Sequence, residues 1–62
     1  MDFKLLDERE VAALTSIRIS TLQYFRRVGG GPKYSKLGRL VRYRLSDVAE
    51  WVANNLHVSA AG

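Results

Sequence analysis

The chain has 62 residues, of which 47% are hydrophobic and 26% charged, with one histidine and no cysteine. The length excludes a large fold, because a chain this short buries only about 60% of its unfolded surface. The absence of cysteine excludes a disulfide framework and a thiolate metal site. No apolar run approaches the roughly 18 residues of a membrane span, so we expect one soluble, cytoplasmic domain over residues 1–57 and a disordered tail at 58–62.

Charge is distributed unevenly along the chain. Ten basic residues against six acidic ones give a net charge of +4 and a pI near 10. The middle of the chain, Val11 to Ser46, contains no acidic residue and has a net charge of +8, whereas each end has a net charge of −2. Such a stretch repels itself unless an anionic partner offsets the repulsion. The pattern indicates a nucleic-acid surface rather than a membrane surface; a solvated face kept for solubility is the alternative.

A first helix is predicted over about Glu8–Leu14. Asp7 and Glu10 have the spacing of a capping box, in which each side chain accepts a hydrogen bond from the other's backbone N–H group. Val11 and Leu14 supply an apolar stripe behind this start. A helix of about two turns is unstable alone, so we expect this one to pack on another element.

A second helix follows after a short turn. Its apolar face is defined by residues spaced by three and four: Ile17, Thr21, Leu22, Phe25 and Val28. The opposite face carries Ser20, Gln23, Tyr24 and Arg27, with Arg26 beside it. The sequence defines the start of this helix only to within a residue or two of Arg18. The cap signal is weak there, because arginine has no acceptor oxygen with which to cap a helix. The run of glycines at residues 29–31, followed by Pro32, is predicted to end the helix.

The next segment predicts a β-hairpin with strands over Tyr34–Leu37 and Leu40–Arg44. A two-residue loop would pair Lys36 with Val41 and mix polar with apolar side chains on each face. A three-residue loop would pair Leu37 with Val41 and direct Leu37, Val41 and Tyr43 inward. We prefer the three-residue loop, because it separates the apolar side chains from the basic ones.

A last helix is predicted to begin at Ser46, with Ser46 as its cap and Asp47 complementing the positive helix end. Its inner face is formed by Val48, Trp51, Val52 and Leu56, and it should fray near residues 54–57. The order helix, helix, hairpin, helix defines the predicted fold class as mainly α with a small β-hairpin.

The inventory of reactive side chains argues against an enzyme. The single histidine, His57, lies at the predicted helix end, away from any carboxylate cluster, and one histidine without cysteine cannot hold zinc. The triple glycine lacks the lysine and serine that follow it in a phosphate-binding loop. We therefore expect no catalytic residue, no metal, no cofactor and no small-molecule substrate.

Nucleic-acid recognition accounts for the same elements. Two short helices joined by a tight turn are typical of proteins whose second helix enters the major groove, where glutamine can pair with adenine and arginine with guanine. The residues expected to contact DNA on this helix are Arg18, Ser20, Thr21, Gln23, Tyr24, Arg26 and Arg27. On the hairpin they are Lys36, Arg39, Arg42 and Arg44. Arg39 at the hairpin tip suits a narrow minor groove; a solvated helix face and an ordinary polar turn are the alternatives.

Several segments resemble the excisionase and AlpA-like group of small winged helix-turn-helix proteins, which is related to the DNA-binding domain of MerR regulators. The resemblance is carried by Leu5–Leu14, Ile17, Ser20-Thr21-Leu22, Gly31–Tyr43, Ser46-Asp47-Val48 and Glu50-Trp51, and it covers about residues 5–52. Two positions depart from the group: Arg18 stands where a serine-type cap is usual, and Ser16 stands where glycine is common.

The resemblance implies a winged helix-turn-helix protein of a phage, plasmid or genomic island that binds double-stranded DNA in the bacterial cytoplasm or nucleoid. The leading hypothesis is an excisionase, or recombination directionality factor, that bends attachment-site DNA for an integrase. Copies packing side by side on repeated sites are favoured. The close alternative is a transcription regulator of such an element.

A third hypothesis is a small protein-interaction module, such as an antiactivator or antitoxin, with secondary DNA binding. Its discriminating feature would be a grouped, exposed apolar patch. The candidates for such a patch, Ile19, Leu40 and Val58, are scattered along the chain.

Overall fold

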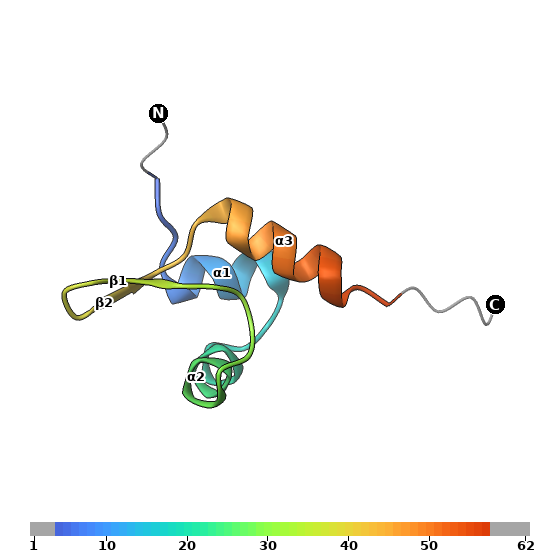
Figure 1. The fold of residues 1–62 in the computed structure, drawn as a ribbon, viewed down its shortest axis with the longest axis horizontal. Coiled ribbons are helices and arrows are strands. Elements are labelled where there is room, and N and C mark those ends of the chain that lie inside the picture. Colours follow the sequence, from blue (N-terminus) through green and yellow to red (C-terminus); the bar gives the residue numbers. More distant parts are fainter. Residues whose placement is uncertain (1–3, 58–62) are drawn as a thin grey trace.

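The computed structural model describes residues 4–57, which form three α-helices and one two-stranded antiparallel sheet (Figure 1). In chain order these are α1 (Glu8–Thr15), α2 (Ile19–Val28), β1 (Ser35–Leu37), β2 (Leu40–Arg42) and α3 (Leu45–Asn55). The predicted element order is confirmed, and the fold is a mainly helical winged helix-turn-helix with the hairpin as its wing. The tail predicted at 58–62 lies outside the described residues. No helix in the described part is long and apolar enough to cross a membrane.

The helices and the wing extend in different directions. Figure 1 shows α2 end-on below α1, α3 above them, and the hairpin projecting away on the side where α1 begins. The strand β1 is exposed along its whole length, whereas Val41 of β2 packs against the core.

The start of α1 is formed as predicted. Asp7 Oδ1 accepts a hydrogen bond from the Glu10 N–H group at 2.9 Å, and Glu10 Oε1 accepts one from the Asp7 N–H group at 3.0 Å. The helix ends at Thr15, and Ser16 follows it with a left-handed φ of 61°. Glycine adopts this conformation at lower cost than serine, which agrees with the departure expected at Ser16 from the resemblance.

The boundaries of α2 are set by its backbone. Arg18 occupies the N-cap without a side-chain cap, and its carbonyl accepts from the N–H groups of Thr21 and Leu22 at 3.0 and 3.1 Å. At the other end Gly29 has a φ of 84°, as the glycine run predicted. A Cβ atom on Gly31 would lie 2.7 Å from the Cβ atom of Phe25, so only glycine permits this close packing of the chain against α2.

The predicted hairpin register is wrong. Lys36 pairs with Val41, so the loop contains only Gly38 and Arg39. Gly38 has a positive φ of 63° and Arg39 does not, which is the pattern of a type II′ turn. The preferred three-residue loop relied on separating apolar from basic side chains, and this separation selects a register only where one face is buried. Leu37, expected to point inward, is 53% exposed.

The predicted cap of the last helix is also wrong. The helix begins at Leu45, before Ser46, and Arg44 takes the N-cap position without a side-chain cap. The Arg44 carbonyl accepts from the N–H groups of Asp47 and Val48 at 3.0 and 3.1 Å. Ser46 lies inside the first turn of α3 rather than before it, so its hydroxyl does not occupy the capping position. Arg44, predicted as part of the wing, therefore lies at the start of α3.

Five buried side chains form the core, one from each of five segments: Leu6, Val11, Leu22, Tyr43 and Val48. Leu6 and Tyr43 also exchange two backbone hydrogen bonds of 2.8 Å, so the segment before α1 pairs with the end of the wing. Three residues that the periodicity predicted on apolar faces are instead 60%, 57% and 66% exposed: Leu14, Val28 and Leu56.

Candidate nucleic-acid interface

The outward face of α2 presents most of the predicted recognition residues. The exposed members are Arg18, Ser20, Gln23, Tyr24 and Arg27. They face away from the core because Leu22, on the other side of the helix, is completely buried. Thr21 is only partly exposed. The Arg27 guanidinium carbon lies 5.6 Å from the centre of the Tyr24 ring, a cation–π distance that restrains both side chains.

Arg26 behaves differently from its neighbours on α2. Its Nη1 donates to Tyr43 Oη at 2.7 Å, its Nη2 donates to Glu8 Oε1 at 3.0 Å, and its side chain is 17% exposed. Burial tends to lower the pKa of Arg26, but the hydrogen bonds to Tyr43 and Glu8 outweigh it and raise that pKa. The guanidinium thus joins α1, α2 and the end of the wing, and its hydrogen bonds hold it among these elements.

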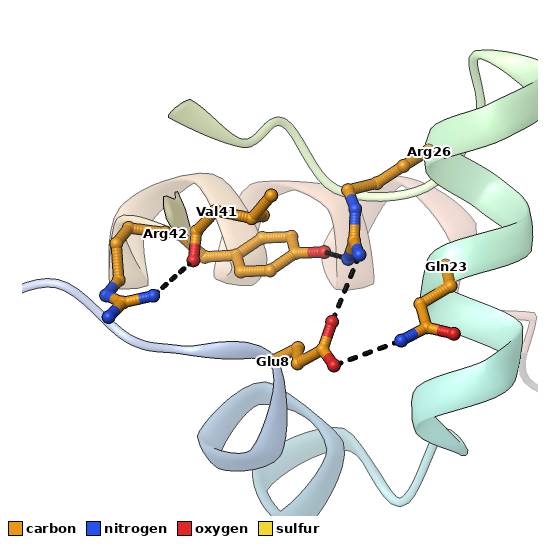
Figure 2. A network of polar contacts seen from close by, with 6 residues as sticks. Glu8, Gln23, Arg26, Val41 and Arg42 are labelled. Carbon is orange, nitrogen blue, oxygen red and sulfur yellow. Dashed lines mark hydrogen bonds and ion pairs between the residues drawn. The ribbon is translucent and has the colours of Figure 1, made fainter. Parts of the chain in front are cut away.

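Glu8 is the centre of this network and was not predicted as a site residue. Its Oε2 accepts a hydrogen bond from Gln23 Nε2 at 3.1 Å, while its Oε1 accepts from Arg26 (Figure 2). The pairs are separated by 15 and 18 residues, so no local pattern identifies them. One feature of the sequence could have pointed to this contact. Arg26 lies beside the apolar face of a helix that contains no acidic residue, so a buried Arg26 needs an acidic partner from another segment.

The wing residues differ in how freely they can reach a ligand. Arg39 lies in the turn and Lys36 on β1, and both are exposed. Arg42 is partly buried, and its Nη1 donates to the Val41 carbonyl at 2.8 Å. Between the start of α1 and the wing lies a hollow of about 430 Å³, lined by Asp7, Glu8, Arg9, Arg39, Leu40, Val41 and Arg42. Two wing arginines therefore border the same hollow as Glu8, which itself contacts Gln23 of α2.

Arg44 is the fourth predicted wing residue, and its guanidinium forms an ion pair with Asp47. Its Nε donates to Asp47 Oδ2 at 2.9 Å and its Nη2 to Oδ1 at 3.2 Å. The hydrogen bond from Arg44 lowers the pKa of Asp47 below its ordinary value, so the carboxylate stays ionised. Arg44 therefore has an acidic partner within the protein, while its side chain stays 62% exposed.

An apolar groove of about 640 Å³ lies on a different part of the surface, between α1 and α3. Its lining includes three leucines that are 60%, 57% and 66% exposed: Leu14, Leu45 and Leu56. The apolar residues expected to be scattered do not contribute to it: Ile19 is partly buried on α2, Leu40 is on the wing, and Val58 lies outside the described residues. The structure therefore groups exposed apolar side chains that the sequence left unrelated.

The described residues hold no group of three or more histidine, cysteine, aspartate or glutamate side chains that could bind a metal ion. His57 is exposed beyond the end of α3.

Comparison with known proteins matches most of the chain to a protein family. A family model described as a helix-turn-helix domain matches residues 5–56, a range that includes the three helices and the wing. No curated protein and no solved structure matches the chain.

Proposed function

The chain belongs to the helix-turn-helix domain family, a DNA-binding and typically non-enzymatic family, and on this premise we propose that it reads specific sequences in double-stranded DNA. In this proposal the outward face of α2 enters the major groove and the wing contacts the adjacent backbone or minor groove. Neither a cofactor nor a small-molecule substrate has a role in it.

The outward face of α2 carries the proposal. Gln23 and Arg27 lie four residues apart and are both exposed, so one face of the helix offers the two side-chain types that pair with adenine and guanine. Tyr24 beside them suits a phosphate oxygen. The helix has no acidic residue in its first turn and no side-chain cap, so its positive end is open to a phosphate.

The wing supplies the second part of the proposed interface. Lys36 and Arg39 are exposed on the hairpin, and Arg42 borders the hollow that separates the wing from α1. Arginine at the tip of a hairpin can enter a narrow minor groove, where the negative potential is strongest. The wing contacts contribute affinity, whereas the α2 contacts contribute most of the sequence preference.

Single alanine substitutions should separate these two contributions. Gln23→Ala or Arg27→Ala should lose about 1–3 kcal/mol of discrimination at one base pair, because a bidentate base contact is removed. Arg42→Ala should weaken binding to all sequences alike, because a phosphate contact carries no sequence information. The measurement is selection from a randomised duplex pool with wild-type protein, followed by titration of each variant against the selected and mismatched duplexes.

One result would contradict the assignment of the recognition face. If Gln23→Ala leaves both the footprint and the preference unchanged, the recognition face is not the outward face of α2. Circular dichroism of each variant verifies that the fold is retained, since all three side chains lie outside the five-residue core.

We further propose that the protein acts as an excisionase, or recombination directionality factor, of a mobile element, with copies packing side by side on attachment-site DNA and assisting an integrase. The support is the resemblance of residues 31–52 to the wing and closing helix of the excisionase and AlpA-like group. This assignment places the protein in the bacterial cytoplasm or nucleoid. A transcription regulator of the same kind of element uses the same DNA contacts and is the nearest alternative.

An in vitro excision assay with the integrase of the same element separates the two roles. We expect excision product to depend on this protein and the footprint to lie within the attachment site. Protection of a neighbouring promoter without any effect on excision would instead identify a transcription regulator.

A protein-interaction role is the second candidate function, favoured by the grouped leucines of the groove between α1 and α3. Exposed apolar patches of this kind mark contact surfaces in small proteins. The groove and the outward face of α2 belong to different elements, so protein contact and DNA binding are compatible.

A further inference from the structure

We propose that Glu8 is a specificity-determining residue of the DNA interface, which fixes the side-chain amide of Gln23 so that α2 selects adenine at the base pair Gln23 reads. The inference deepens the proposed function and depends on it, because Gln23 must reach a base. Glu8 itself acts as a positioning residue that sets which polar atom Gln23 presents.

The Glu8 carboxylate is held in place by two partners. Oε1 accepts from Arg26 Nη2 at 3.0 Å, and Arg26 is fixed in turn by Tyr43 Oη at 2.7 Å. The side chain of Glu8 is only 29% exposed. Oε2 is therefore a stationary acceptor beside the outward face of α2, at 3.1 Å from Gln23 Nε2. An anchored group of this kind restricts the rotamers of its neighbour without contacting DNA itself.

The chemistry of a carboxylate decides the orientation of the amide. An ionised carboxylate can only accept hydrogen bonds, so it attracts the amide NH₂ group of Gln23 and repels the amide oxygen. Figure 2 shows the nitrogen of Gln23 turned toward Glu8 and the oxygen turned away. An amide without such a neighbour can flip by half a turn and exchange its donor and acceptor. Glu8 removes this freedom.

The fixed amide narrows the set of bases that Gln23 can read. With one N–H hydrogen on Glu8, Gln23 retains an outward acceptor, Oε1, and a second N–H donor. Adenine offers the complementary pair in the major groove, the N6 amino donor and the N7 acceptor. Guanine offers two acceptors, N7 and O6, and the outward oxygen of Gln23 disfavours both. The geometry therefore favours adenine and disfavours guanine most strongly.

The test is a double-mutant cycle on base discrimination. The probe is a duplex selected from a randomised pool by wild-type protein, together with its variants at the position whose preference Gln23→Ala abolishes. Glu8→Gln should reduce the preference for adenine over guanine at that position by about tenfold, toward the value of Gln23→Ala. In the Gln23→Ala background, Glu8→Gln should change the preference no further, because its effect passes through Gln23.

Two further variants control for charge and for folding. Glu50→Gln removes an exposed acidic charge on α3, so it should share any general gain in affinity without altering the preference. Glu8→Asp keeps a carboxylate for Arg26 but withdraws it from Gln23 by one methylene group. If Glu8→Gln does not fold, a loss of preference in Glu8→Asp tests the inference instead.

Each outcome has one meaning. If Gln23→Ala loses the preference while Glu8→Gln and Glu8→Asp retain it, the inference is overturned and the proposed function stands. A uniform loss of affinity with preference intact assigns Glu8 a structural role only and also overturns the inference. A preference for guanine at the Gln23 position contradicts the amide orientation. If the base preference of the wild-type protein does not depend on Gln23, the proposed recognition face on α2 is wrong, whatever the role of Glu8.

Discussion

Leu22→Ala is expected to leave the protein largely unfolded. Leu22 is completely buried and, from α2, packs in the core with Leu6, Val11, Tyr43 and Val48. Replacing a buried leucine by alanine costs about 2–5 kcal/mol, through lost transfer free energy and the cavity left behind. A single core of this size supplies about 3–5 kcal/mol of net stability, so the substitution removes most or all of it. Urea denaturation followed by circular dichroism measures the loss.

Leu14→Ala is the matched control for this substitution. It removes the same atoms from a neighbouring helix, but Leu14 is 60% exposed, so we expect a change of no more than about 0.5 kcal/mol in unfolding free energy. A Leu22→Ala protein with the denaturation midpoint of the wild type would mean that α2 does not pack through Leu22. That result would also contradict the assignment of the recognition face, because this face is defined as the side of α2 opposite Leu22.

The features that are set by residues close together in the sequence, such as helix ends and helix faces, were predicted well. The capping box of Asp7 and Glu10 and the left-handed Gly29 are signals contained within a few residues, and both are present in the structure. The outward face of α2 follows from the spacing of its apolar residues, since a helix with one buried face must expose the other. The exposed positions of Gln23 and Arg27 were accessible from the sequence for this reason.

The features that join distant segments could not be predicted in the same way. The backbone pairing of Leu6 with Tyr43 and the network around Glu8 bring together residues far apart in the chain. No periodicity encodes such contacts, because each is a consequence of how the finished elements pack. Arg26 shows the effect clearly: its helix position suggests a surface cation, while its partners place it inside.

The prediction of the hairpin register was wrong for a different reason. Its register was inferred from the segregation of apolar and basic side chains, a rule that holds for strands with one buried face. The wing has no such face on β1, and the turn geometry of Gly38 decided the pairing instead. For an exposed wing, the turn type is the better predictor of register.

The salt dependence of DNA binding is the largest effect we expect in solution. The proposed interface retains five basic side chains, Arg18, Arg27, Lys36, Arg39 and Arg42, because Arg26 and Arg44 are paired with Glu8 and Asp47. Bringing these five positive charges to the DNA neutralises about five phosphate charges, whether a side chain contacts a phosphate or a base edge, and gives a slope near −4.5 in a plot of log affinity against log salt. Affinity should therefore fall about 500-fold between about 50 and about 200 mM salt. Fluorescence anisotropy with a labelled duplex measures the slope.

Two arginines, one in the turn of the wing and one at the start of α3, provide the control. Arg39→Ala should reduce the magnitude of the slope by about 0.9, because one positive charge is removed from the DNA interface. Arg44→Ala should leave the slope unchanged, because the charge of Arg44 is already compensated by Asp47 at 2.9 Å. If Arg26 and Arg44 both contacted phosphates, seven contacts would give a wild-type slope near −6.3 instead. A slope near zero would contradict the electrostatic account of the basic middle segment, whose net charge of +8 would then serve only solvation.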